Sequence, residues 1–117
     1  MSFRYISLVR NSTGKINVDT ATYFIDYLII CLLCFLSAFD DAELVVMGST
    51  RHNEDMVLLE SLKAEVERLN LQHNVRFIAN GAYSELQTYM KKASIGIHTM
   101  WNEHFGISVV EMMAAGL

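Results

Sequence analysis

The sequence predicts an α/β fold in which helices flank an open parallel sheet, resembling a Rossmann domain. Short apolar runs alternate with helical patterns along the chain, and residues typical of turns separate them. The size agrees with this fold, because 117 residues of which 52% are hydrophobic can form one domain with its own core. We therefore predict a single domain over residues 1–117.

Four short apolar runs are the predicted strands. They cover residues 5–9, 43–47, 75–78 and 95–100. The second run contains two adjacent valines and ends at Gly48, which is typical of an interior parallel strand that is buried on both faces. Parallel neighbours need crossover connections, so a helix is expected between successive strands.

Three helices are predicted after the second, third and fourth strands. The first covers residues 54–69, the second opens at Ser84 and Gln87, which have capping-box spacing, and the third covers about residues 108–115 before Gly116. The side chains expected to face the core are Leu58, Leu59, Leu62, Val66 and Leu69 in the first helix, and Leu86, Tyr89, Met90 and Ala93 in the second.

The most apolar segment begins at Thr20 and ends at Phe39, with sixteen apolar or aromatic residues out of twenty. This length approaches the ~20 residues that cross a bilayer. A crossover helix covered on both sides has the same pattern. Asp26 inside the run disfavours membrane insertion by about 2.5–3.5 kcal/mol. A buried or interfacial helix is the favoured interpretation, and a membrane span is the open alternative.

Charge and residue spacing disfavour several classes of function. The net charge of −4 provides no basic surface for nucleic acid. Cys31 and Cys34 lie inside the apolar run and are expected to be buried thiols. The histidines, at positions 52, 73, 98 and 104, show no ligand spacing on one helix, and no glycine-rich dinucleotide fingerprint follows a strand. We therefore expect neither a metal nor a bound cofactor.

Ligands of open parallel sheets bind beyond the carboxyl ends of the strands, where loops lead into helices. Three segments are predicted at that edge: residues 10–15, 48–53 and 101–107. Arg10 and Lys15 bracket the first segment and provide two cations suited to a diphosphate.

The third segment leads from one carboxylate, Glu103, to a second, Glu111, eight residues later. If the last helix begins near Gly106, Glu103 lies in the loop just before its N-terminus and Glu111 lies within its first turns. The backbone N–H groups of Phe105, Gly106 and Ile107 then face the same crevice, at the positive end of the helix dipole. Amides there suit a diphosphate, and a carboxylate offers two oxygens to paired sugar hydroxyls.

Other roles for these residues stay open. Ser108 and Glu111 also fit a capping box, so Glu111 could simply cap its own helix. Glu103 and His104 could belong to a solvated loop. His98, inside an apolar strand, is more often a hydrogen-bonded core histidine than an active group.

The residues around both carboxylates resemble a known family, the retaining glycosyltransferases that use nucleotide sugars and share an E-x7-E motif in a two-domain GT-B architecture. Glu103 and Glu111 are that pair. Within the family, residues 95–107 (IGIHTMWNEHFGI) and 109–116 (VVEMMAAG) are similar to the dolichol-pathway GDP-mannose α-1,2-mannosyltransferases. Residues 45–55 (VVMGSTRHNED) resemble the donor domain of the same enzymes.

The resemblance implies that the chain is the C-terminal, nucleotide-sugar-binding half of such an enzyme. Glu111 is then expected on the ribose hydroxyls of GDP, and Glu103 and the neighbouring amides on the mannose and the diphosphate. The Arg/Lys pair is expected on the diphosphate. The implied donor-binding set is Arg10, Lys15, Glu103, His104, Phe105, Gly106, Ile107 and Glu111, with Glu103 as the catalytic residue.

The resemblance also implies partners and a location. Such enzymes transfer mannose from GDP-mannose to the dolichol-linked oligosaccharide of protein N-glycosylation, at the cytosolic face of the endoplasmic reticulum membrane. They need an N-terminal acceptor domain that this sequence lacks, so we expect an incomplete domain that transfers negligibly by itself. A span over residues 20–39, with its basic flank in the cytosol, would translocate the donor site. The alternatives are a noncatalytic membrane-associated fragment without nucleotide affinity and an enzyme that uses another sugar nucleotide.

Overall fold

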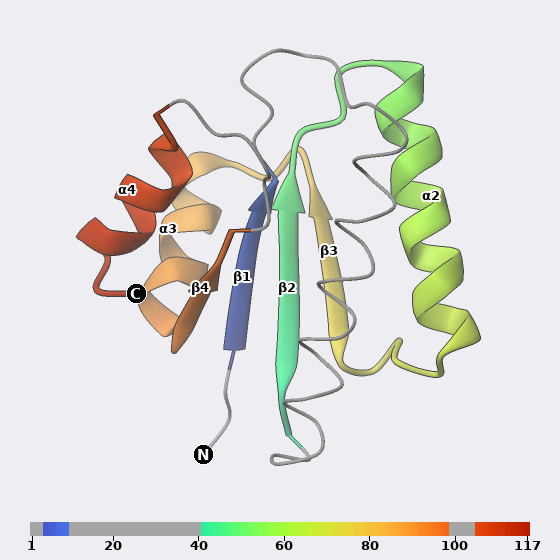
Figure 1. The fold of residues 1–117 in the computed structure, drawn as a ribbon, viewed down its shortest axis with the longest axis horizontal. Helices are drawn as coiled ribbons and strands as arrows, with labels where there is room; N and C mark the ends of the chain where they lie inside the picture. Colours follow the sequence, from blue (N-terminus) through green and yellow to red (C-terminus); the bar gives the residue numbers. More distant parts are fainter. Residues whose placement is uncertain (1–3, 10–40, 99–104) are drawn as a thin grey trace.

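The protein is described by a computed structural model over residues 4–9, 41–98 and 105–117. The strands described within these ranges form a parallel sheet with helices on both of its faces, which confirms the predicted fold class (Figure 1). The elements are β1 (Arg4–Val9), β2 (Glu43–Gly48), α2 (Asn53–Arg68), β3 (Val75–Ala79), α3 (Tyr83–Lys92), β4 (Ile95–Ile97) and α4 (Ile107–Ala114).

The described strands form one sheet in the order β3-β2-β1-β4, and every neighbouring pair is parallel. The chain moves outward from β1 to β3 and then returns to place β4 on the other side of β1. Helix α2 covers one face of the sheet, whereas α3 and α4 cover the other (Figure 1). The reversal makes a switch point between β1 and β4, which is where ligands bind in sheets of this kind.

Strand β2 is the centre of the core, because its side chains are buried alternately on the two faces. Leu44 and Val46 belong to the cluster that includes Val66 of α2. Val45, which is 0% exposed, and Met47 point to the opposite cluster. The partners in that second cluster are Leu86, Met90 and Met112 from α3 and α4. Burial on both faces is the predicted behaviour of an interior parallel strand.

Helix α2 begins and ends close to the predicted positions. A side chain in its first turn, that of Asp55, binds backbone N–H groups just before the helix. The Asp55 carboxylate accepts hydrogen bonds from the N–H groups of Arg51, at 2.7 Å, and His52, at 3.1 Å. This arrangement satisfies donors that would otherwise have no partner before a helix begins. The predicted apolar stripe is confirmed: Leu62 and Val66 are buried, and Leu58, Leu59 and Leu69 are half-buried.

The start of α3 differs from the prediction. The capping box expected at Ser84 and Gln87 is wrong, because the N-cap is Ala82 and Ser84 already lies in the first turn. The Ala82 carbonyl accepts the Glu85 N–H at 3.0 Å. A short turn from β3 leads directly into α3, so the position of the sheet sets where the helix begins. The inward face is as predicted, with Leu86 and Met90 buried and Tyr89 and Ala93 half-buried.

The last strand and helix are displaced slightly from their predicted bounds. Strand β4 ends at Ile97, so His98 follows the strand instead of lying within it, and residues 99–100 of the predicted strand are outside the described part of the chain. Helix α4 ends close to Gly116, whose φ of 89° lies in the left-handed region that glycine tolerates.

The apolar run at residues 20–39, with Cys31 and Cys34, lies outside the described residues. None of the helices in the described ranges is long and apolar enough to cross a bilayer.

Arg76 of β3 contacts Glu43 of the neighbouring strand β2 and Tyr89 of helix α3. Its Nε lies 3.1 Å from a Glu43 carboxylate oxygen, and its guanidinium donates a hydrogen bond of 3.1 Å to the Tyr89 hydroxyl. The hydrogen bond with Tyr89 and the charge of Glu43 raise the pKa of Arg76 above its ordinary value. The hydroxyl of Tyr89 is therefore engaged within the scaffold.

Strand β4 and helix α4 approach closely at Gly96. A Cβ atom at this position would lie 2.5 Å from the Met112 sulfur and 3.3 Å from the Met112 Cβ. Met112 is only 5% exposed, so neighbouring core side chains limit its movement. Gly96 therefore allows the spacing between β4 and α4.

We predict that Gly96→Ala lowers the free energy of unfolding by about 1–3 kcal/mol, because the added methyl group overpacks the core. The same substitution in a Met112→Ala background should cost much less, because the conflicting side chain is gone. Urea unfolding followed by circular dichroism measures both. An equal cost in the two backgrounds would show that the contact with Met112 is not the cause.

Candidate functional site

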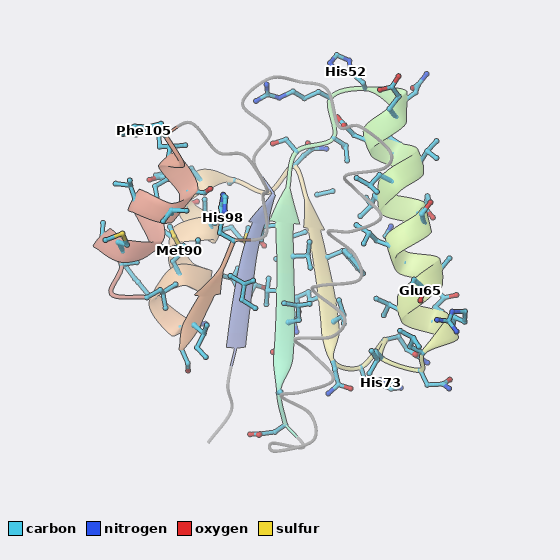
Figure 2. All side chains as sticks on the ribbon, viewed as in Figure 1. His52, Glu65, His73, Met90, His98 and Phe105 are labelled. Atoms are coloured by element: carbon cyan, nitrogen blue, oxygen red, sulfur yellow. The ribbon has the colours of Figure 1, made fainter. Side chains whose placement is uncertain are left out.

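The candidate site lies at the carboxyl edge of the sheet, where the strands lead into the helices. Figure 2 shows His52 at the start of α2 and Phe105 before α4, both at this edge. Glu65 and His73 lie at the opposite edge (Figure 2). The ends of β1 and β2 are level, because Val9 pairs with Gly48.

Asn80 ties the loops that follow β2 and β3 together. Its backbone N–H donates to the Gly48 carbonyl at 2.9 Å. Its side-chain oxygen accepts the Thr50 N–H at 2.9 Å, and its side-chain nitrogen donates to the Thr50 hydroxyl at 2.7 Å. Asn80 has a φ of 56°, which asparagine tolerates better than most residues. These bonds give the edge a defined shape beside the start of α3.

Helix α4 presents its N-terminus at the same edge. Its N-cap is Gly106, in the left-handed conformation with a φ of 68°, and the Gly106 carbonyl accepts the Val110 N–H at 3.1 Å. Helix geometry leaves the N–H groups of Ile107 and the next two residues without acceptors inside the helix. Together with the helix dipole, these donors favour an anion such as a phosphate. Phe105, just before the cap, is 78% exposed.

Glu111 lies in the second turn of α4, with its carboxylate beside α3. The Tyr83 hydroxyl donates to one carboxylate oxygen, Oε1, at 3.4 Å, and the other oxygen, Oε2, is shielded from solvent. The capping-box alternative for Ser108 and Glu111 is wrong, because the N-cap is Gly106 and Ser108 is a helical residue that is only 2% exposed. The glycine turn starts the helix earlier than the Ser-x-x-Glu pattern indicates.

Tyr83 is a site residue that the sequence analysis did not identify. It is the first residue of α3, is 52% exposed, and lies 28 residues before Glu111 in the chain. The signal that could have indicated it is its place two residues after the Asn80-Gly81 turn, at the binding edge. Its proximity to Glu111 depends on the packing of α3 beside α4.

Four of the predicted site residues lie outside the described residues: Arg10, Lys15, Glu103 and His104. The structure describes Phe105, Gly106, Ile107 and Glu111, and all four belong to α4 or to the turn that starts it. His98 lies at the carboxyl end of β4, half-buried, close to this edge (Figure 2). Over residues 41–98 and 105–117, no three histidine, cysteine, aspartate or glutamate side chains form a cluster suited to a metal ion.

Comparison with known proteins identifies the family. The profile described as "Glycosyl transferases group 1" matches residues 26–117, which includes all the described elements except β1. The chain belongs to this glycosyltransferase family. The match includes both the Asn80 turn and the α4 N-terminus, so the whole described part of the candidate site lies inside the family's domain.

Curated relatives give a narrower likeness. The chain is 49% identical over 74 residues to the mouse (Mus musculus) GDP-Man:Man(3)GlcNAc(2)-PP-Dol alpha-1,2-mannosyltransferase and 47% identical over 74 residues to the human protein of that name, matches that cover 63% of this chain. The protein of that name from Caenorhabditis elegans is 45% identical over 75 residues, 64% of this chain. The aligned part spans about 15% of the length of the mouse and human relatives and 16% of the worm protein. No solved structure matches the chain significantly.

We predict that Asn80→Ala destabilises the glycosyltransferase domain by about 2–4 kcal/mol. Two side-chain hydrogen bonds, each worth about 0.5–1.5 kcal/mol, are lost, and alanine also costs about 1 kcal/mol at this positive φ. Asn80→Gly loses the same bonds without that backbone cost, so it should be the more stable variant by about 1 kcal/mol. Denaturant unfolding compares the two, and an alanine variant as stable as the glycine variant would refute the backbone argument.

Proposed function

We propose that this chain is the donor-binding domain of a retaining glycosyltransferase with GT-B architecture and that its ligand is GDP-mannose. Glu111 carries the proposal: its carboxylate lies in the second turn of α4, whose N-terminal amides open at the switch point of the sheet. The names of the relatives support GDP-mannose as the donor and a dolichol-linked oligosaccharide as the acceptor.

In this proposal the ribose and the diphosphate of GDP contact different parts of α4. The carboxylate of Glu111 accepts hydrogen bonds from the ribose hydroxyls, since its oxygens can each accept more than one bond. The N–H groups that start α4 face the diphosphate, together with Arg10 and Lys15. The remaining members of the proposed donor-binding set are Glu103, His104, Phe105, Gly106 and Ile107.

Mannose transfer breaks the bond between mannose C1 and the β-phosphate oxygen and forms a bond from C1 to an acceptor hydroxyl oxygen, whose proton leaves with the departing GDP. Negative charge grows on the departing GDP, and fixed amides and cations beside the diphosphate stabilise that charge. Glu103 is the proposed catalytic residue next to the mannose. The acceptor hydroxyl must be held against mannose C1 and water must be kept out, which is the task of an acceptor domain. Binding of the donor is therefore the activity to test in the 117-residue chain.

The same reasoning gives a proposed location. An enzyme that acts on a dolichol-linked acceptor works at a membrane, and we propose the cytosolic face of the endoplasmic reticulum. Contact with that membrane through residues 20–39 is part of this proposal, because sixteen of these twenty residues are apolar or aromatic.

We predict saturable binding of GDP-mannose to the chain and a loss of about tenfold or more in affinity in Glu111→Gln. The neutral amide accepts fewer and weaker hydrogen bonds than the carboxylate, and bonds to a charged group are worth about 1.5–3 kcal/mol. Titration calorimetry measures the affinity, and circular dichroism checks the fold. Glu67→Gln, the same change on an exposed residue of α2 at the other side of the sheet, is the matched control and should bind as the unchanged chain does.

Two outcomes would contradict the proposal. A folded chain that does not bind GDP-mannose, but partitions into lipid vesicles through residues 20–39, would favour the noncatalytic membrane fragment. Competition by UDP as effective as that by GDP would favour an enzyme that uses another sugar nucleotide.

A further inference from the structure

We infer that the Tyr83 hydroxyl is a positioning group for the Glu111 carboxylate, orienting it toward the ribose diol of the donor. The inference rests on the proposed donor site, and it adds a residue from a different helix to that site. Tyr83 starts α3 and donates to Glu111 Oε1, across the contact between α3 and α4, at 3.4 Å.

The backbone that carries Tyr83 is held on its N-terminal side. At Gly81 a Cβ would lie 2.8 Å from an Ile78 methyl carbon and 2.9 Å from a Glu85 carboxylate oxygen, so the turn is packed against its surroundings. The preceding residue, Asn80, is bonded to the loop after β2 through its backbone and its side chain. The tyrosine ring therefore projects from an anchored position and has few ways to reach its hydroxyl partner.

The backbone that carries Glu111 is also held. Ser108, one turn earlier on α4, is 2% exposed, and Met112, the next residue, is 5% exposed. The position of the carboxylate then depends on which rotamer the half-buried Glu111 side chain adopts. A hydrogen bond from a fixed hydroxyl to Oε1 selects among those rotamers. Pre-selection lowers the entropy lost when a diol binds.

The bond from Tyr83 is compatible with ligand binding. A carboxylate oxygen can accept more than one hydrogen bond, so a hydroxyl on Oε1 does not by itself exclude a ribose hydroxyl. The O–H···O separation of 3.4 Å is long, and bonds of this kind in unliganded sites commonly tighten once the ligand is bound. Tyr83 is half exposed, so the bond lies at a surface that a nucleotide can reach.

The test separates positioning from a purely structural link between the two helices. Affinities for GDP and for 2′,3′-dideoxy-GDP are measured by calorimetry on the unchanged chain and on Tyr83→Phe, which removes only the hydroxyl. We expect Tyr83→Phe to weaken GDP binding by about threefold to tenfold, the value of one such hydrogen bond. The dideoxy ligand lacks the diol that Glu111 is proposed to bind, so its affinity should be the same for both proteins.

Tyr89→Phe is the matched control, because the Tyr89 hydroxyl accepts a hydrogen bond from Arg76 instead and should not affect either ligand. If Tyr83→Phe binds GDP as tightly as the unchanged chain while Glu111→Gln binds weakly, the positioning role is refuted and the donor site stands. An equal loss for both ligands would also refute it, since the hydroxyl would then act elsewhere. Absence of GDP binding by the unchanged, folded chain would overturn both proposals.

Discussion

The burial of β2 on both faces is the constraint on which the rest of the structure depends. Val45 and Met47 need a cover on one side, while Leu44 and Val46 need one on the other. Helix α2 covers Leu44 and Val46. The chain must then cross to the opposite face, where α3 and α4 pack. That crossing places β4 beside β1 and creates the switch point at the carboxyl edge. The position of the candidate site therefore follows from a requirement of the core.

Periodicity predicted the described elements and their inward faces, because the side chains of β2, α2 and α3 repeat as buried elements require. It did not predict the N-caps of α3 and α4. Ser84 and Ser108 both carry local capping signals, yet the turns at Ala82 and Gly106 start the helices earlier. A cap contributes about 1 kcal/mol, whereas the packing of a helix against a sheet buries several apolar side chains. Tertiary packing therefore decides the boundary.

The candidate site was predictable only where it is local in sequence. The run from Phe105 to Glu111 is contiguous, so its motif and the geometry of a helix N-terminus were enough to nominate it. Tyr83 lies on another helix and contacts Glu111 from there. The sequence around Glu111 contains nothing that would identify Tyr83 as its partner. Contacts between distant segments depend on the relative placement of α3 and α4, which periodicity leaves undetermined.

That relative placement has a physical origin at the sheet. Gly96 lets α4 lie close to β4 through Met112, and Met112 also shares a cluster with Leu86 and Met90 of α3. The residue next to Met112 in the chain is Glu111, so the contact that sets the helix spacing also sets how far the carboxylate stands from α3. A hydrogen bond of 3.4 Å tolerates little additional separation. The orientation of Glu111 is thus coupled to the packing of the core beneath it, and a change in a buried apolar contact would alter the site without touching a polar residue.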